Sequence, residues 1–275
     1  MSEYSFIIRG GIIVFAEKVI IVTGGSNGMG KYMAKKFADE GAQVVITGRD
    51  IDRLKVAQEE IGDNAHPFQM DVRSVESVAA LVAFTDEKFG RIDGLVNNAA
   101  GNFIVKAEDL SPNGWKSVID IVLNGTFYCS SAVGKYWIEK GQKGSILNML
   151  ATYAWDAGAG VIHSAAAKAG VIHSAAAKAG VMSLTRTLAV EWGSQYGIRV
   201  NGIAPGPIER TGGAEKLWES NEAAKRTLES IPLGRLGKPE EIAELAAFIM
   251  SDKASYMNGE IVTLDGGQWL NKSPF

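Results

Sequence analysis

The sequence predicts an α/β protein, a Rossmann-like doubly wound parallel sheet flanked by helices and built as a single domain. Short β-branched, apolar runs alternate with longer segments of helical periodicity along the whole chain. A glycine-rich turn separates the first such run from the first helical segment. The length of 275 residues suits one large domain, and no linker-like stretch divides it. We therefore assign residues 15–275 to this domain and residues 1–14 to an N-terminal extension.

The first strand, Lys18–Thr23, has the continuous apolar character of a strand buried on both faces. The other strands are expected at Gln43–Thr47, Ala65–Met70, Gly94–Asn97, Ser145–Leu150, Ile198–Ile203 and Ile261–Leu264. Helices are predicted at Lys31–Glu40, Asp52–Ile61, Val75–Phe89, Trp115–Lys140, Ser174–Tyr196 and Glu240–Met250. The two longest helices each end before a glycine, which is the usual residue just past a helix C-terminus.

Composition narrows the classes of partner. The net charge is −3 and the chain has no basic block, so we expect neither nucleic acid nor a membrane as a partner. The apolar run Ile7–Phe15 is too short to span a bilayer. Cys129 is the only cysteine, which excludes an intrachain disulfide and favours a cytoplasmic location. With three histidines and no Cys/His cluster, we expect no metal.

The turn after the first strand has the composition of a dinucleotide site. Glycines let the backbone turn tightly and approach a pyrophosphate, while the helix N-terminus offers free N–H groups. The alternative is a purely structural glycine turn, because glycine spacing alone is weak evidence. The strand–turn–helix context favours cofactor binding by Gly24, Ser26, Asn27, Gly28, Met29 and Gly30.

The second strand leads into Gly48 and Arg49, where an acidic residue would hold the ribose 2′-hydroxyl of NAD. Glycine and a guanidinium instead suit a 2′-phosphate, which predicts NADPH/NADP as the cofactor. A solvated Arg49 with no ligand is the alternative.

Motifs spread from about residue 15 to the C-terminus resemble those of the short-chain dehydrogenase/reductase family. They are Thr23–Gly30, Asp71-Val72, Asn97–Gly101, Asn124, a helical lysine, Pro205–Ile208 and Asp265–Gly267. The resemblance implies that Asp71 and Val72 flank the adenine and that Asn98, Ala99 and Ala100 line the cofactor ribose. It also implies a nicotinamide covered by Pro205, Gly206 and Ile208, a catalytic role for Asn124, and a homotetramer.

One departure from the family is decisive. A ten-residue block occurs twice, at Gly160–Ala169 and Gly170–Ala179, and each copy has serine four residues before its lysine, where the family has tyrosine. An alcohol hydroxyl has a much higher intrinsic pKa than a phenol and exchanges protons poorly near neutral pH. Ordinary ketone reduction is therefore disfavoured.

The chain resembles the one branch that lacks this tyrosine, the NADPH-dependent 2,4-dienoyl-CoA reductases. The similar segments include Asn98–Phe103, Asp120–Thr126 and Tyr153. By this resemblance Asn102 and Tyr153 face the thioester of an acyl-CoA substrate, and a serine and a lysine complete the site. Tyr153 as a loop anchor and Asn102 as a turn residue are the alternatives. An NADPH ketoreductase and a catalytically impaired NADP-binding protein remain open as functions.

Either copy of the block could supply the serine and lysine. If Ser164 and Lys168 served, ten extra residues would rotate the rest of the helix by about −80° and turn its apolar residues off their packing face. If Ser174 and Lys178 serve, the extra residues only lengthen a loop, at about 0.5 kcal/mol. Only Lys168, however, keeps the branch's spacing of fifteen residues from Tyr153. We favour Ser174 and Lys178.

Overall fold

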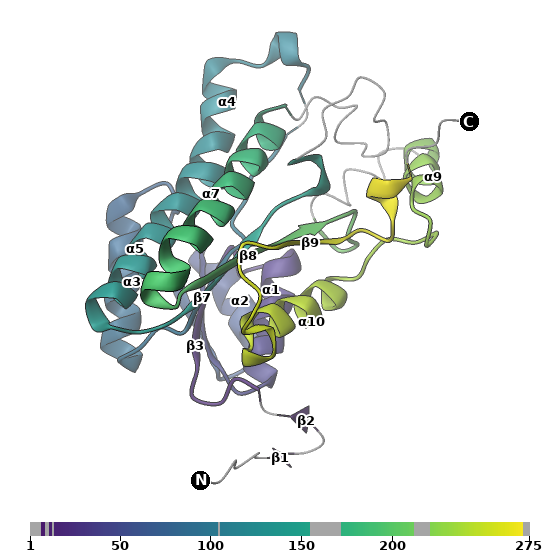
Figure 1. Cartoon of the computed structure of the whole chain (residues 1–275). Coiled ribbons are helices and arrows are strands. Elements are labelled where there is room, and N and C mark those ends of the chain that lie inside the picture. The colour runs from purple at the N-terminus through teal and green to yellow at the C-terminus, as the bar shows by residue number, and fades with distance from the viewer. Residues whose placement is uncertain are drawn as a thin grey trace.

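The computed structural model describes residues 7–8, 11–12, 14–103, 105–154, 172–211 and 221–271. Seven strands form one sheet in the order β5-β4-β3-β6-β7-β8-β9, and every neighbouring pair is parallel (Figure 1). This confirms the predicted doubly wound sheet. The strands are β3 (Val19–Thr23), β4 (Gln43–Gly48), β5 (Ala65–Gln69), β6 (Gly94–Asn97), β7 (Ser145–Met149), β8 (Arg199–Pro205) and β9 (Ile261–Leu264).

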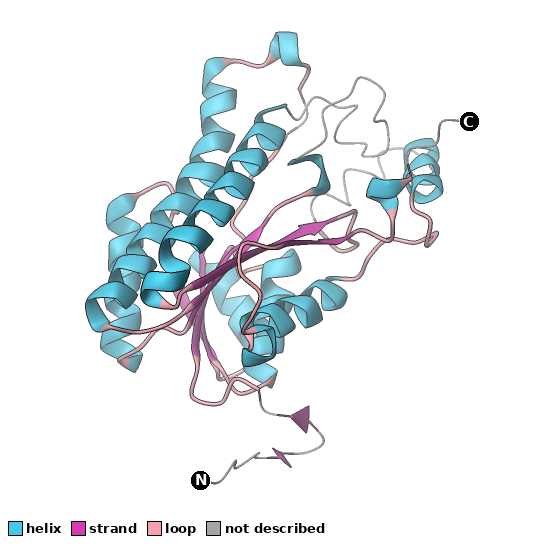
Figure 2. Ribbon diagram, viewed as in Figure 1, coloured by secondary structure: helices cyan, strands magenta, loops and turns pink. Residues whose placement is uncertain are grey.

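Helices cover both faces of the sheet (Figure 2). One face packs against α1 (Gly28–Asp39), α2 (Ile51–Ile61) and α10 (Pro239–Met250). The other packs against α3 (Val75–Phe89), α5 (Gly125–Lys140) and α7 (Ile172–Tyr196). Shorter elements are α4 (Pro112–Ile119), α9 (Asn221–Ser230), η1 (Ala107–Asp109), η3 (Thr152–Ala154), η4 (Asp252–Ala254) and η5 (Gln268–Leu270).

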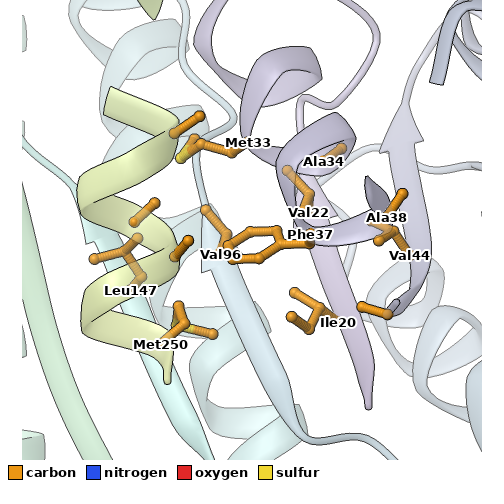
Figure 3. Close-up of a cluster of buried hydrophobic side chains, with 14 of the residues drawn as sticks. Ile20, Val22, Met33, Ala34, Phe37, Ala38, Val44, Val96, Leu147 and Met250 are labelled. Carbon is orange, nitrogen blue, oxygen red and sulfur yellow. The ribbon is translucent and has the colours of Figure 1, made fainter. Parts of the chain in front are cut away.

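Phe37 of α1 is fully buried between the sheet and its covering helices (Figure 3). Val22 and Val96 of the central strands belong to the same cluster, as does Met250 at the end of α10. Burial of one phenylalanine ring contributes about 1.5–3 kcal/mol to folding. The cluster fixes α1, and with it the glycine turn that precedes it, against strands β3 and β6.

The strand order places a topological switch between β3 and β6. The chain leaves β3 toward β4 on one side and later returns to β6 on the other. In an open α/β sheet, ligands bind outside the carboxyl ends of the strands at such a point. The segments that follow β3, β6, β7 and β8 therefore meet at one edge of the molecule.

The predicted single helix over 115–140 is wrong in detail. Its first part begins earlier, because Ser111 accepts a hydrogen bond from the Gly114 N–H and Pro112 occupies the first turn. A π-helical turn, η2 (Asp120–Asn124), then separates α4 from α5. Such turns often accompany functional sites.

The N-terminal part of the chain contains two short strands and the first residue of the packed core. Two short strands, β1 (Ile7–Ile8) and β2 (Gly11–Ile12), pair antiparallel within the predicted extension. Phe15 is 3% exposed and its ring meets Phe37 edge-on, so the packed structure has begun by this residue. The domain boundary itself stays a prediction. In the part of the chain that is described, no helix is long and apolar enough to cross a membrane.

Candidate active site

The turn after β3 is held by one threonine. The Thr23 hydroxyl donates to the Val96 carbonyl at 3.3 Å and accepts from the backbone N–H groups of Asn98 and Ala99, both at 3.0 Å. The Asn98 side chain donates back to the carbonyls of Thr23 and Gly24, at 3.0 and 3.1 Å. The ends of β3 and β6 are thus tied together, and Gly24 and Asn98–Ala99 lie side by side.

The glycines of this turn fit a dinucleotide. Gly24 has a φ of +65°, and a Cβ there would lie 3.0 Å from the Ala99 Cα. A Cβ on Gly30 would collide with the Gly24 carbonyl and the Asn98 amide. Helix α1 begins at Gly28 after an extended Asn27 and has no acidic side chain in its first turn. Its first N–H groups and positive potential are therefore available to a pyrophosphate.

The end of β4 provides the second part of the cofactor site. Gly48 has no positive φ, and a Cβ on it would lie 3.7 Å from both Leu54 and the Ser26 hydroxyl. Arg49 is exposed, and its charge contributes to lowering the pKa of Asp71. The larger cause of the lowered pKa is Arg73, whose Nε donates to both Asp71 oxygens at 3.0 Å. Arg73 is therefore paired with Asp71, and Arg49 lies exposed just after the end of β4.

The other predicted cofactor residues lie in several different environments. Val72 is 7% exposed and packs against Gly125 at the start of α5. Ala100 is exposed. The segment after β8 is anchored at both ends, because the Gly206 N–H donates to the Leu264 carbonyl at 3.0 Å and the Glu209 N–H donates to Gly237 at 2.9 Å. Pro205, the last residue of β8, and Ile208, within the segment, are both buried. Asn27 lies just before the first residue of α1, and Met29 lies just after it.

Tyr153 and Ser174 lie together at the carboxyl end of the sheet. Tyr153 belongs to η3, just after β7, and its hydroxyl lies 3.1 Å from the Ser174 hydroxyl. Ser174 lies in the first turn of α7 and is 2% exposed. Lys178, one turn further along α7, is 7% exposed, and its ammonium donates to the Met149 carbonyl at the end of β7. The second copy of the repeated block therefore enters this helix.

Burial shifts the pKa values of Tyr153 and Lys178. It raises the pKa of the Tyr153 phenol, and the hydrogen bond with Ser174 opposes this only in part. The phenol is therefore a proton donor at neutral pH. Burial also lowers the pKa of Lys178 to about 8. The ammonium is thus close to titrating in the range in which enzymes commonly work.

The two asparagines predicted for the site are placed differently. The Asn124 amide donates to Asp120 at 2.9 Å across the π-helical turn η2, which lies against α7. Asn102 is exposed. Its neighbour Phe103 meets the ring of His173 edge-on, with ring centroids 4.6 Å apart. Because His173 precedes Ser174, this contact holds the Asn102 segment beside the start of α7.

Two contacts in the site were not predicted from the sequence, and two predicted residues lie outside the described ranges. Ser164 and Lys168, in the first copy of the block, fall outside the described residues. The contact of Phe103 with His173 and the acceptor role of the Met149 carbonyl were not predicted, because no sequence motif marks them. Within the described ranges, no group of three or more His, Cys, Asp or Glu side chains is gathered for a metal ion.

The fold and this edge of the sheet define a nicotinamide-dependent oxidoreductase. A family profile described as enoyl-(acyl carrier protein) reductase matches residues 24–268. The chain belongs to the short-chain dehydrogenase/reductase family.

Relatives place the chain more closely within that family. It is 61% identical over 262 residues to a Bacillus subtilis protein named as a probable 2,4-dienoyl-CoA reductase producing (2E)-enoyl-CoA, with 94% of this chain and 99% of the relative covered. A peroxisomal 2,4-dienoyl-CoA reductase of Arabidopsis thaliana, producing (3E)-enoyl-CoA, is 41% identical and covers 94% of this chain and 87% of its own length. The crystal structure of a Bacillus anthracis short chain dehydrogenase is 61% identical, with a TM-score of 0.84 and coverage of 94% and 99%.

Proposed function

We propose that the protein reduces the conjugated diene of 2,4-dienoyl-CoA thioesters with NADPH. The observation that carries this proposal is the Tyr153–Ser174 contact at 3.1 Å, with Lys178 one turn along the same helix. It provides a phenol at the site although the family's usual tyrosine is replaced by Ser174. The names of the relatives in Bacillus subtilis and Arabidopsis thaliana support the same reaction.

The proposed chemistry suits these residues. When bound, the nicotinamide would supply a hydride, which the δ-carbon of the dienoyl group would accept. Negative charge then spreads through the conjugated system to the thioester oxygen as a dienolate. Donors aimed at that oxygen stabilise the charge as it develops, and we assign this role to the Asn102 amide and the Tyr153 hydroxyl. Since Asn102 is exposed here, we expect it to turn toward the oxygen when substrate binds.

Protonation of a carbon completes the reduction. Tyr153 is the best placed acid, because its phenol is protonated at neutral pH and lies beside the Ser174 hydroxyl. The hydrogen bond with Ser174 lowers the phenol pKa and so offsets part of the acidity that burial removes. The Ser174 hydroxyl then stabilises the phenolate, and a solvent proton restores the phenol. Lys178 is assigned to bind the nicotinamide ribose and to favour the phenolate by its charge. Asn124 is assigned to support Lys178 from the adjacent π-helical turn.

A direct assay tests this proposal. Purified protein is mixed with NADPH and a 2,4-dienoyl-CoA, and the dienoyl and NADPH absorbances are followed together. We expect the two to fall in equal molar amounts. Turnover with ketones only would instead support an NADPH ketoreductase, and cofactor binding with no turnover would indicate an impaired NADP-binding protein.

Cofactor choice is proposed to depend on Gly48 and Arg49. The variant Gly48→Asp is expected to fold, because a Cβ there meets only ordinary contacts at 3.7 Å. The new carboxylate would repel a 2′-phosphate and accept a hydrogen bond from the 2′-hydroxyl of NADH. We therefore expect kcat/KM for NADPH to fall by about 10²-fold and kcat/KM for NADH to rise. Arg49→Ala should weaken the binding of NADPH and leave the binding of NADH unchanged.

Initial rates with both cofactors measure this change. Arg91→Ala is the matched control, since Arg91 pairs with Asp93 beside the opposite, amino-terminal end of β6. An unchanged NADPH/NADH ratio in Gly48→Asp would mean that the 2′-phosphate lies elsewhere.

The pH dependence of cofactor binding is expected to follow Lys178. Since burial lowers its pKa to about 8, NADPH binding by the cofactor-free protein should weaken as pH rises through about 8, where the ammonium loses its charge. The free energy of unfolding should change in the opposite sense. Between about 8 and its unfolded value of 10.5 the unfolded chain binds the extra proton, so this residue's contribution to stability rises with pH.

Fluorescence titrations of NADPH across this pH range, with Lys178→Met as the control, measure the effect on binding. The variant should lose the transition near pH 8. A wild-type affinity that stays flat through this range would contradict the role of the charge.

Assembly and location complete the proposal. We infer that the protein is a homotetramer in the cytoplasm. The assembly is supported by apolar side chains that α5 and α7 leave open, with Phe127 48% exposed and Val190 78% exposed.

A further inference from the structure

Arg210 has an unusual backbone conformation beside the cofactor site. Its φ is +56°, and among described residues only one other non-glycine residue, Glu17, has a positive φ. An L-residue is disfavoured in this left-handed region and remains there only when its surroundings hold it. Arg210 lies in the segment 206–211, which follows β8.

Three elements hold the Arg210 side chain. Its guanidinium lies 4.9 Å from the centre of the Tyr32 ring of α1, and it donates to the Tyr32 hydroxyl at 2.7 Å. It also pairs with Glu240, in the first turn of α10, at 2.5 Å. Within its own segment it pairs with Glu209 at 3.0 Å. One side chain thus joins segment 206–211 to two helices.

These contacts close one side of the dinucleotide site. The methyl group of Thr211 lies 3.8 Å from the position that a Cβ on Gly28 would occupy, at the first residue of α1. Bound phosphates would lie at the start of α1, and the nicotinamide would lie under segment 206–211. Arg210 therefore joins the two elements between which the cofactor is expected to enter and leave.

The guanidinium is already engaged by two carboxylates, from Glu209 and Glu240. A group neutralised in this way is poorly suited to bind a phosphate. Its stacking on Tyr32 instead suits a mechanical role, in which contacts form when the segment is closed and break when it opens.

We propose that Arg210 is a latch, a positioning residue whose contacts with Tyr32 and Glu240 keep segment 206–211 closed and so set the rate of cofactor release. The proposal rests on the proposed function only in requiring a nicotinamide dinucleotide as cofactor. It does not depend on the acyl substrate. Because the latch as proposed contacts no phosphate, the effect should be the same for NADPH and NADP⁺.

The variant Arg210→Gly tests the latch without straining the fold, since glycine adopts this φ freely. We expect release of NADPH, measured by stopped-flow displacement with no acyl substrate present, to become about five- to tenfold faster, the scale of a few lost surface contacts. Amide exchange at Glu209 in the cofactor-free protein should accelerate in parallel, because the segment opens more often. Tyr32→Phe, which keeps the ring, should show a smaller effect.

Arg235→Ala is the matched control. Arg235 precedes α10 and pairs with Glu241 of that helix at 2.7 Å. It makes no hydrogen bond or ion pair to the described residues of α1 or of segment 206–211, and its charge acts on Glu209 only through space. It should leave release unchanged. Salt should accelerate release from the wild type and have little effect on Arg210→Gly, because the ion pair is exposed.

The latch would be overturned if Arg210→Gly released NADPH at the wild-type rate, or if its release rate changed no more than that of Arg235→Ala. A protein that binds no NADP(H) at equilibrium would overturn the cofactor assignment and the latch together. Faster release in Arg210→Gly, in a protein that fails to turn over dienoyl-CoA, would support the latch and reject the proposed reaction.

Discussion

Lys178→Ala is expected to abolish NADPH oxidation with a 2,4-dienoyl-CoA, whereas Lys168→Ala leaves most of it. The two lysines occupy equivalent positions in the repeated block, so the pair of variants is internally matched. The buried Lys178 ammonium donates to the Met149 carbonyl at the end of β7, beside Tyr153 and Ser174. In the proposed mechanism, its loss would remove both a contact for the nicotinamide ribose and the charge that favours the phenolate.

Steady-state rates and NADPH affinity, measured on both variants, distinguish the two copies. We expect the loss in Lys178→Ala to exceed about 10²-fold in kcat/KM, as for other groups that act on the reacting centre. Thermal unfolding shows that each variant is folded. Inactive Lys168→Ala together with active Lys178→Ala would reverse the assignment and place the first copy in the site.

Tyr153→Phe is expected to lower kcat by about 10²–10⁴-fold, the usual contribution of a positioned general acid. The ring stays in place, so NADPH binding should be unchanged. Ser174→Ala should have a smaller effect of about fivefold, because it removes one hydrogen bond worth about 1 kcal/mol and leaves the phenol.

Single-turnover reduction of a dienoyl-CoA measures this chemical step apart from product release. Tyr128→Phe is a suitable control, since Tyr128 lies on α5 and packs, partly buried, against a hydrophobic cluster that does not include Ser174. A Tyr153→Phe protein that keeps the wild-type single-turnover rate would remove the phenol from the mechanism.

The sheet was predictable because buried parallel strands leave a direct trace in the sequence. Runs such as Val19–Thr23 and Gly94–Asn97 are apolar on both faces, and a strand with helices on each side needs that pattern. The break at Asp120–Asn124 was not predictable. A π-helical turn adds one residue between donor and acceptor without changing the apolar pattern on either side.

For the candidate site, the sequence allowed residues to be proposed but did not predict their arrangement. Tyr153 and Ser174 stand 21 positions apart, and no rule of spacing brings two such hydroxyls to 3.1 Å. Their proximity depends on where η3 leaves β7 and where α7 begins. The positive φ of Arg210 is hidden for a similar reason, because arginine has no intrinsic preference for that conformation.

The packing of helix α7 determines where in this chain an insertion can be tolerated. Leu188 of α7 is buried in the hydrophobic cluster on the sheet face that α3, α5 and α7 cover. Leu184 and Trp192 pack against this cluster, and the Trp192 ring fills the space where a Cβ on Gly134 would lie. Each residue of an α-helix rotates the chain by about 100°. Ten residues added within α7 would therefore turn all three side chains about 80° away from α5 and the sheet. When the second copy of the repeated block forms the start of the helix, the rest of the helix keeps its orientation. Natural length variation in this lineage should therefore collect ahead of Ile172, while the stretch from Lys178 to Trp192 keeps a fixed number of residues.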